Sequence, residues 1–165
     1  MSKTEAQVLM EVYENVRGLS KMFITPLIDI DIDHRLEIND TKFNSAYWII
    51  AHLVWTEHFL LVQGVGGEDM NIPWLEEYSF GTNPDEVKTK PPYEEVLKKL
   101  DEVHQKAVEI VKGLSDVQLD EENHVNASFG GLKNKRNVII HAIRHEPMHI
   151  GQLTWILKSN GLKFA

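Results

Sequence analysis

The N-terminal stretch of the chain has apolar positions at the three- and four-residue spacing of an amphipathic helix. Ser2 and Glu5 have the spacing of a capping box, so we expect a helix over residues 2–20. The apolar positions expected to face the core are Val8, Leu9, Val12, Val16 and Leu19. The next segment, residues 24–43, contains a proline, a short Ile/Asp alternation and several turn-forming residues. It is expected to be a loop, with a short pair of strands as the alternative.

Three more stretches favour helices. From Asn44 to Gln63 nearly every position is apolar and the stretch ends at GVGG, which is typical of a fully buried helix with a glycine cap. A third helix is expected over residues 92–113, starting at a Pro-Pro pair. A fourth is expected over residues 134–159, ending near Gly161. The inward positions of the third helix are Val96, Leu100, Val103, Ala107, Ile110 and Val111.

Two irregular stretches separate these helices, residues 64–92 and 114–133. The first is punctuated by proline and glycine and carries Trp74, Tyr78 and Phe80. Loops of this length are uncommon in compact domains and often cover a site, so we consider it a candidate lid. Four helices without a convincing strand predict an all-α, four-helix bundle that forms a single domain over residues 1–165.

Charge and composition exclude several classes of protein. The formal net charge of −8 and the lack of a Lys/Arg run argue against nucleic acid as a partner. No apolar run reaches the ~20 residues of a spanning helix, and the N-terminus lacks the apolar stretch of a secretory signal, so we expect a cytoplasmic protein without a membrane partner. The chain has no cysteine, which excludes disulfides, thiolate metal ligands and a cysteine nucleophile. Any reacting thiol would belong to a substrate.

Histidines on the second and fourth expected helices carry the strongest chemical signal. His145 and His149 are four residues apart, so at ~100° per residue they lie about 40° apart on one helix face. Gln152 continues the same face. On the second helix His52 shares a face with Trp48, which places its imidazole in the core of the bundle.

These histidines can be interpreted in two ways. A single buried histidine usually forms a hydrogen bond with a neighbour. Three converging imidazoles instead favour coordination of one divalent metal ion, which satisfies all three rings and leaves a fourth position open for water or substrate. We therefore predict a metal site formed by His52, His145 and His149. Zinc is the expected ion, with nickel, iron or manganese as alternatives, because imidazole nitrogen binds several of these metals.

The remaining histidines carry less weight. His141 lies one turn before His145 and is either a neighbour of the site or a surface residue. His58 is rotated away from His52 and is expected to face elsewhere. Loops or a polar helix face are expected for three others, which are assigned no role: His34, His104 and His124.

The segment from His145 to His149, HEPMH, also matches the H-E-x-x-H motif of zinc peptidases, in which the glutamate acts as general base. Nothing after His149 is His, Asp or Glu, so the downstream third ligand of those enzymes is missing. A peptidase cleft also usually offers an edge strand to its substrate, and no good strand is expected. A metallopeptidase is therefore the weaker alternative.

The segments NSAYWIIAHLVWTEHFLL and HAIRHEPMHIGQL together resemble the DinB-like superfamily. The resemblance spans nearly the whole chain. It implies a four-helix bundle with one metal-binding histidine on the second helix and two on the last, at positions matched by His52, His145 and His149. The Gly151-Gln152-Leu153 sequence also fits the family pattern.

The resemblance implies a range of activities, which includes bacillithiol- and mycothiol-dependent transferases and isomerases and metal-dependent hydrolases. We therefore expect a small-molecule enzyme, either a thiol-dependent S-transferase with a low-molecular-weight thiol as co-substrate or a hydrolase. Glu57 or Glu146 would be the general base of a hydrolase if either faced the pocket. The alternative is a non-catalytic metal-binding bundle, although structural zinc sites usually have four protein ligands. A homodimer is a further hypothesis.

Overall fold

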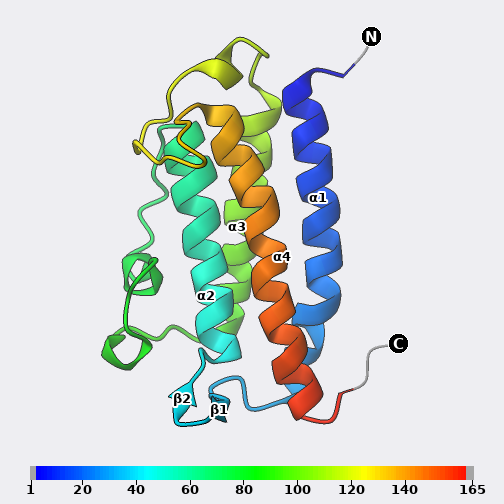
Figure 1. Cartoon of the computed structure of the whole chain (residues 1–165), viewed down its shortest axis with the longest axis vertical. Coiled ribbons are helices and arrows are strands. Elements are labelled where there is room, and N and C mark those ends of the chain that lie inside the picture. The colour runs from blue at the N-terminus through cyan, green and yellow to red at the C-terminus, as the bar shows by residue number, and fades with distance from the viewer. Residues whose placement is uncertain (1–2, 163–165) are drawn as a thin grey trace.

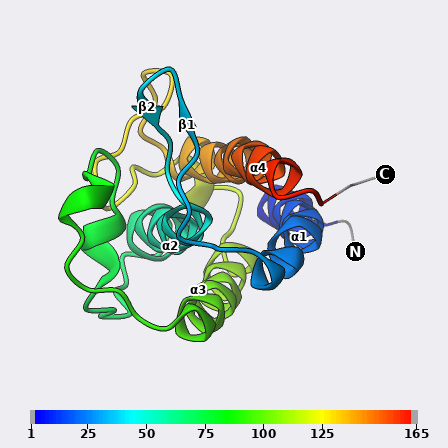
Figure 2. The same cartoon turned by 90° about the horizontal axis from the view of Figure 1, so that it is seen from below.

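The computed structural model describes residues 3–162, in which four long helices pack side by side (Figure 1). They are α1 (Glu5–Ile24), α2 (Ala46–Glu57), α3 (Tyr93–Lys112) and α4 (Lys135–Ser159). Seen from below in Figure 2, α4 lies beside α1, and α2 lies beside α3. The all-α, four-helix bundle predicted from the sequence is confirmed. Within residues 3–162, none of the helices has the length and apolar content that crossing a membrane requires.

Shorter elements connect the long helices. Strands β1 (Glu37–Ile38) and β2 (Thr41–Lys42) pair antiparallel, with Glu37 opposite Lys42. The turn residues Asn39 and Asp40 have φ angles of 49° and 60°, as a type I′ hairpin turn requires. The short pair of strands named as the alternative for residues 24–43 is therefore present. The short 3₁₀ helices are Thr25–Asp29, Leu75–Tyr78, Pro84–Glu86 and Gln118–Asp120.

Helix α2 is buried on all sides, as its apolar sequence predicted. Ser45 caps its N-terminus, and after Glu57 the chain continues as a π-helical segment, His58–Val65, in which each turn holds more residues than an α-helical turn. This segment ends at two glycines. A Cβ atom at Gly66 would lie 2.7 Å from a side chain of α3, and Gly67 has a φ of +70°. Both positions therefore favour glycine.

Helix α1 turns a different face to the core than its apolar pattern predicted. Val8, Val12 and Leu19 are 46%, 45% and 57% exposed. Leu9 and Val16 are partly buried and pack against the core, as predicted. The prediction was wrong for the other three positions because the buried face contains polar residues, which the apolar pattern does not mark. The buried positions are Ala6, Met10, Tyr13, Arg17, Ser20 and Ile24.

The start of α1 also differs from the expectation. Thr4 is the N-cap residue, and its side chain accepts a hydrogen bond from the Gln7 backbone N–H. The Gln7 side chain accepts one from the Thr4 backbone N–H, which completes a capping box. Ser2, which the sequence suggested as the cap, lies outside the described residues.

Helices α3 and α4 agree with the sequence analysis. Five of the six predicted inward positions of α3 are buried and Ile110 is half-buried. Helix α4 runs through Pro147 and ends where Gly161 takes a φ of +80°. There the Leu162 N–H donates to the Leu157 carbonyl, as in a Schellman motif.

A buried guanidinium joins all four helices. Arg17 of α1 donates hydrogen bonds to Glu146 of α4, with N···O distances of 2.8 and 2.9 Å, and to Glu57 of α2 at 2.7 Å. It also donates to the Leu100 carbonyl of α3 at 3.2 Å. The second oxygen of Glu57 lies 2.7 Å from His104 Nδ1. His104 therefore contacts the buried charges, and its expected place on a polar face was wrong.

Arg17 and Glu57 keep their charges in spite of burial. Burial alone would raise the pKa of Glu57, but the charge of Arg17 and the hydrogen bond from His104 hold that pKa below its ordinary value. Burial would likewise lower the pKa of Arg17, but the charge of Glu57 and other neighbours raises it well above its ordinary value. The cluster is thus a compensated set of buried charges, which is costly to break by removing one partner.

Replacing the buried cation should destabilise the fold strongly. We expect Arg17→Met to lower the free energy of unfolding by about 3–5 kcal/mol, because two buried carboxylates lose their partner. The matched control is Lys21→Met, which removes an ion pair with Asp101 between side chains that are each 53% exposed. That change should cost less than about 1 kcal/mol. Urea denaturation followed by circular dichroism measures both, and equal losses would contradict the role given to Arg17.

Candidate metal centre

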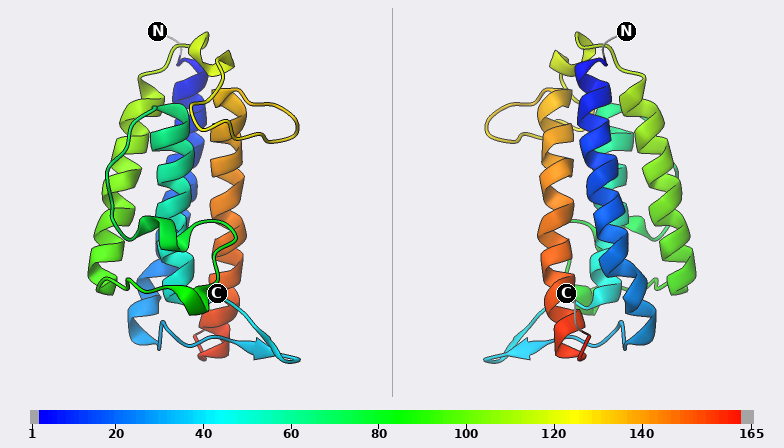
Figure 3. Two further views of the ribbon diagram at one scale, coloured as in Figure 1. Left: turned by 90° about the vertical axis from the view of Figure 1, so that its left-hand side faces the viewer. Right: turned by 90° about the vertical axis from the view of Figure 1, so that its right-hand side faces the viewer.

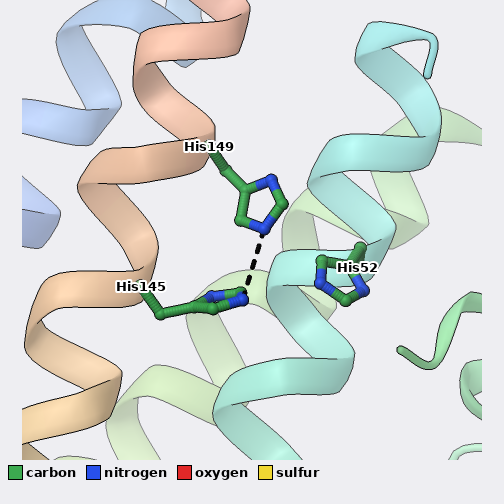
Figure 4. Close-up of side chains that lie close together, drawn as sticks. All are labelled: His52, His145 and His149. Atoms are coloured by element: carbon green, nitrogen blue, oxygen red, sulfur yellow. Dashed lines mark hydrogen bonds between the residues drawn. The ribbon is translucent and has the colours of Figure 1, made fainter. Parts of the chain in front are cut away.

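Three histidines from two helices converge on one point. His52 comes from α2, and His145 and His149 come from α4; one nitrogen of each lies within 4.8 Å of the others (Figure 4). The Nε2 atoms of His145 and His149 are 3.3 Å apart. Two nitrogens that share a tetrahedral metal, each about 2.0–2.1 Å from it, are themselves separated by about 3.3 Å. The donor set and its spacing therefore fit one divalent ion.

Hydrogen bonds orient two of the three rings. The Nδ1 atom of His52 lies 2.7 Å from the Tyr78 carbonyl, so we assign the proton to Nδ1 and the lone pair to Nε2. The Thr56 hydroxyl lies 3.3 Å from that Nε2 atom. In the same way, Nδ1 of His149 donates to the Gln152 side-chain oxygen at 3.0 Å. Contacts of this kind fix the tautomer and the ring direction of a metal-binding histidine.

The environment keeps the imidazoles in the form that binds metals. Burial lowers the pKa of His52 to about 4, and burial together with the neighbouring histidines lowers the pKa of His145 to about 3. Burial also lowers the pKa of His149. Coordination requires a neutral imidazole with a free lone pair. At neutral pH these rings therefore need lose no proton before a metal binds.

Aromatic rings on α2 pack around His52. The Trp48 and Trp55 rings both stack on its imidazole, with centroid distances of 4.8 and 5.7 Å. Trp55 also stacks on Phe59 at 5.0 Å. The shared helix face of His52 and Trp48, predicted from the sequence, is confirmed. The stacking restricts rotation of the imidazole ring.

A cavity of about 880 Å³ opens beside the three histidines. Its walls come from α2, the π-helical segment, the loop around residues 76–82, Phe129 and α4. Glu57 and Glu146 do not line it, because both are turned into the bundle toward Arg17. The condition under which either of them could act as a base, that it face the pocket, is therefore not met. The carboxylate in the wall belongs to Glu76.

The segment between α2 and α3 forms one wall of this cavity. Figure 3 (left) shows it crossing over α2, and Trp74 and Tyr78 anchor it in the core. The Tyr78 hydroxyl donates to the Thr89 carbonyl, while the Tyr78 carbonyl binds His52. Phe80, by contrast, is 86% exposed. The segment is packed at its base, and its role as a moving lid stays a prediction.

Two further histidines have defined positions. His141 lies in the cavity wall, where its ring stacks on Phe129 at a centroid distance of 3.7 Å. Its Nδ1 atom accepts hydrogen bonds from Arg144. His58 faces away from the three histidines, as predicted, and its Nε2 atom accepts a hydrogen bond from the Met70 backbone N–H. His141 is therefore a neighbour of the site, the first of the two alternatives that the sequence left open.

Comparison with known proteins agrees with this architecture. The chain matches the family model of the DinB superfamily over residues 19–153, a range that contains all three converging histidines. No curated protein matches the chain. Because the family match covers most of the sequence, the chain belongs to the DinB superfamily.

Proposed function

We propose that this protein is a metal-dependent enzyme that acts on a small molecule, with the ion held by His52, His145 and His149. The observation that carries this proposal is the convergence of three neutral imidazoles at the edge of a large cavity. Among residues 3–162, no fourth His, Asp or Glu belongs to the same group. Three protein ligands and an open fourth position are typical of catalytic zinc sites, whereas structural sites usually have four protein ligands.

Thiol transfer is the reaction class that the site favours. A bound divalent ion supplies a Lewis acid and lowers the pKa of a coordinated thiol or water molecule. Once the His52 Nε2 lone pair is engaged in coordination, the Thr56 hydroxyl is free to donate to a substrate atom. Hydrolysis would need a base beside the water molecule. Glu57 and Glu146 are both occupied by Arg17, and the one carboxylate among the described residues of the wall, Glu76, already accepts a hydrogen bond from the Trp55 indole N–H. The protein has no thiol of its own, so the thiol would be a co-substrate.

A metallopeptidase fits the geometry less well. In the H-E-x-x-H mechanism the glutamate must reach the water at the metal. Glu146 is 2% exposed, is bound to Arg17 inside the bundle and does not line the cavity. In this chain the two histidines of the motif would therefore bind the metal, while its glutamate stabilises the fold through Arg17.

The first test is the metal content of protein purified without an affinity tag or added metal. Elemental analysis should find about one divalent ion per chain in the wild type, lost in His52→Ala and His145→Ala. His34→Ala is the matched control, because His34 is exposed and does not belong to the cluster, and it should keep the ion. The same measurement separates zinc from nickel, iron and manganese. If the wild type binds no metal even after reloading, the three histidines are ordinary packed residues of the bundle and the proposal is wrong.

The hydrogen bond from His149 to Gln152 gives a second test. Gln152→Leu removes the acceptor for the Nδ1 proton, so we expect metal affinity to fall about tenfold, the lower end of the effect known for such supporting contacts. Gln152→Glu keeps an acceptor oxygen at this position and should bind the metal at least as tightly as the wild type. Competition with a chromophoric chelator measures all three proteins. Equal affinities would show that this contact does not support the site.

The open position can be tested by substituting cobalt(II) for the native ion. Adding 2-phenylethanethiol should produce a sulfur-to-cobalt charge-transfer band, because the thiol takes the fourth position. Azide should perturb the visible cobalt spectrum by the same route. If neither ligand changes the spectrum, the coordination shell is closed, and the non-catalytic metal-binding bundle becomes the better interpretation.

A further inference from the structure

The wall of the cavity beside the three histidines has an uneven distribution of charge. Glu76 supplies a carboxylate to the wall, while no lysine or arginine lies among the described residues that line it. The Glu76 side chain accepts a hydrogen bond from the Trp55 indole N–H at 3.3 Å. Five Trp and Phe rings also line it, those of Trp48, Trp55, Phe59, Phe80 and Phe129.

Two cationic side chains, Arg144 and Lys42, lie near this wall without lining it. Arg144 is exposed, and two of its nitrogens lie 3.0 and 3.2 Å from Nδ1 of His141, to which they donate. Lys42 lines a separate cavity of about 510 Å³, which shares Asn44 with the first. A negative group on the body of a bound molecule would therefore find no positive side chain in the wall to compensate it.

The physical chemistry of this wall selects between substrates. Aromatic rings present a negative face, which attracts a cation and repels an anion. Moving an anion out of water without a partner is costly, and the Glu76 carboxylate adds to that cost. The coordination site favours a negatively charged or electron-rich group, because three neutral imidazoles leave the charge of a divalent ion uncompensated. The two parts of the cavity therefore favour different parts of one molecule.

We propose that the substrate of this site has an electron-rich, metal-binding head group and an apolar or aromatic body that is neutral or positively charged. A thiol that carries several carboxylates would fit this wall poorly. This inference rests on the proposed function, because it takes the metal as the anchor of the head group.

Three matched probes test the preference. Benzohydroxamate binds metals through its hydroxamate group, and its para position can carry hydrogen, an aminomethyl group or a carboxylate. Each probe is titrated into the cobalt(II)-loaded, full-length protein while the visible cobalt spectrum is recorded. The cationic probe should bind about two- to fivefold more tightly than the neutral probe, the range expected for cation–π contacts at partly exposed sites, and the carboxylate probe should bind most weakly.

A charge-neutral variant identifies the residue responsible. Glu76→Gln removes the charge and keeps an oxygen that can accept from Trp55, so the aromatic wall should be preserved. Affinity for the aminomethyl probe should fall about two- to fivefold, the range of an exposed ion pair, while affinity for the neutral probe stays the same. Glu122→Gln is the matched control, because Glu122 is exposed and does not line the cavity.

The outcomes separate the two proposals. If cobalt does not bind at the histidines, the proposed function fails. If cobalt binds but the carboxylate probe binds most tightly, or no probe binds, the metal site stands and the inference about the substrate is overturned. An equal effect of Glu76→Gln on all three probes would also overturn it, because the charge of Glu76 would then play no part in selection.

Discussion

The buried guanidinium of Arg17 is the constraint on which the arrangement of the bundle depends. It binds Glu57 of α2 and Glu146 of α4, and so it sets how each of these helices is rotated about its own axis. Glu146 is adjacent to His145 in sequence, and adjacent residues point about 100° apart on a helix. Holding the carboxylate in the core therefore turns the imidazole toward the cavity. The ion cluster and the three histidines use different faces of the same two helices, α2 and α4. Interactions that hold the carboxylates in the core therefore also hold the histidines in position.

Much of the fold and the site could be predicted because the relevant signals are local. The continuous apolar run of α2 and the spacing of apolar residues on α3 each define a helix without knowledge of its neighbours. The four-residue separation of His145 and His149 places both on one face of any helix. His52 was found because an imidazole within a wholly apolar helix must be buried. The family match covers all three of these histidines.

Other features depend on contacts that no local pattern records. The partners Arg17 and Glu146 are 129 positions apart, so a polar face of α1 could not be recognised as buried. The apolar stripe with Val12 and Leu19 was a misleading signal for the same reason. The support for His52 comes from a backbone carbonyl, that of Tyr78, and a carbonyl is present at every residue whatever its side chain. The aromatic cavity wall likewise combines α2 with Phe129 and Phe80 from separate loops.

The π-helical segment His58–Val65 has a consequence for comparing this chain with its relatives. A π-helical turn corresponds to an extra residue inserted into an α-helix, and such insertions often lie near functional sites. A relative that is one residue shorter in this stretch can form an ordinary α-helix here, with the positions of His52 and Glu57 unchanged, since both precede the segment. A single alignment gap between residues 58 and 65 would therefore mark a difference in helix winding, and it would shorten the separation of His52 from the glycines at the end of the helix without moving either His52 or Glu57.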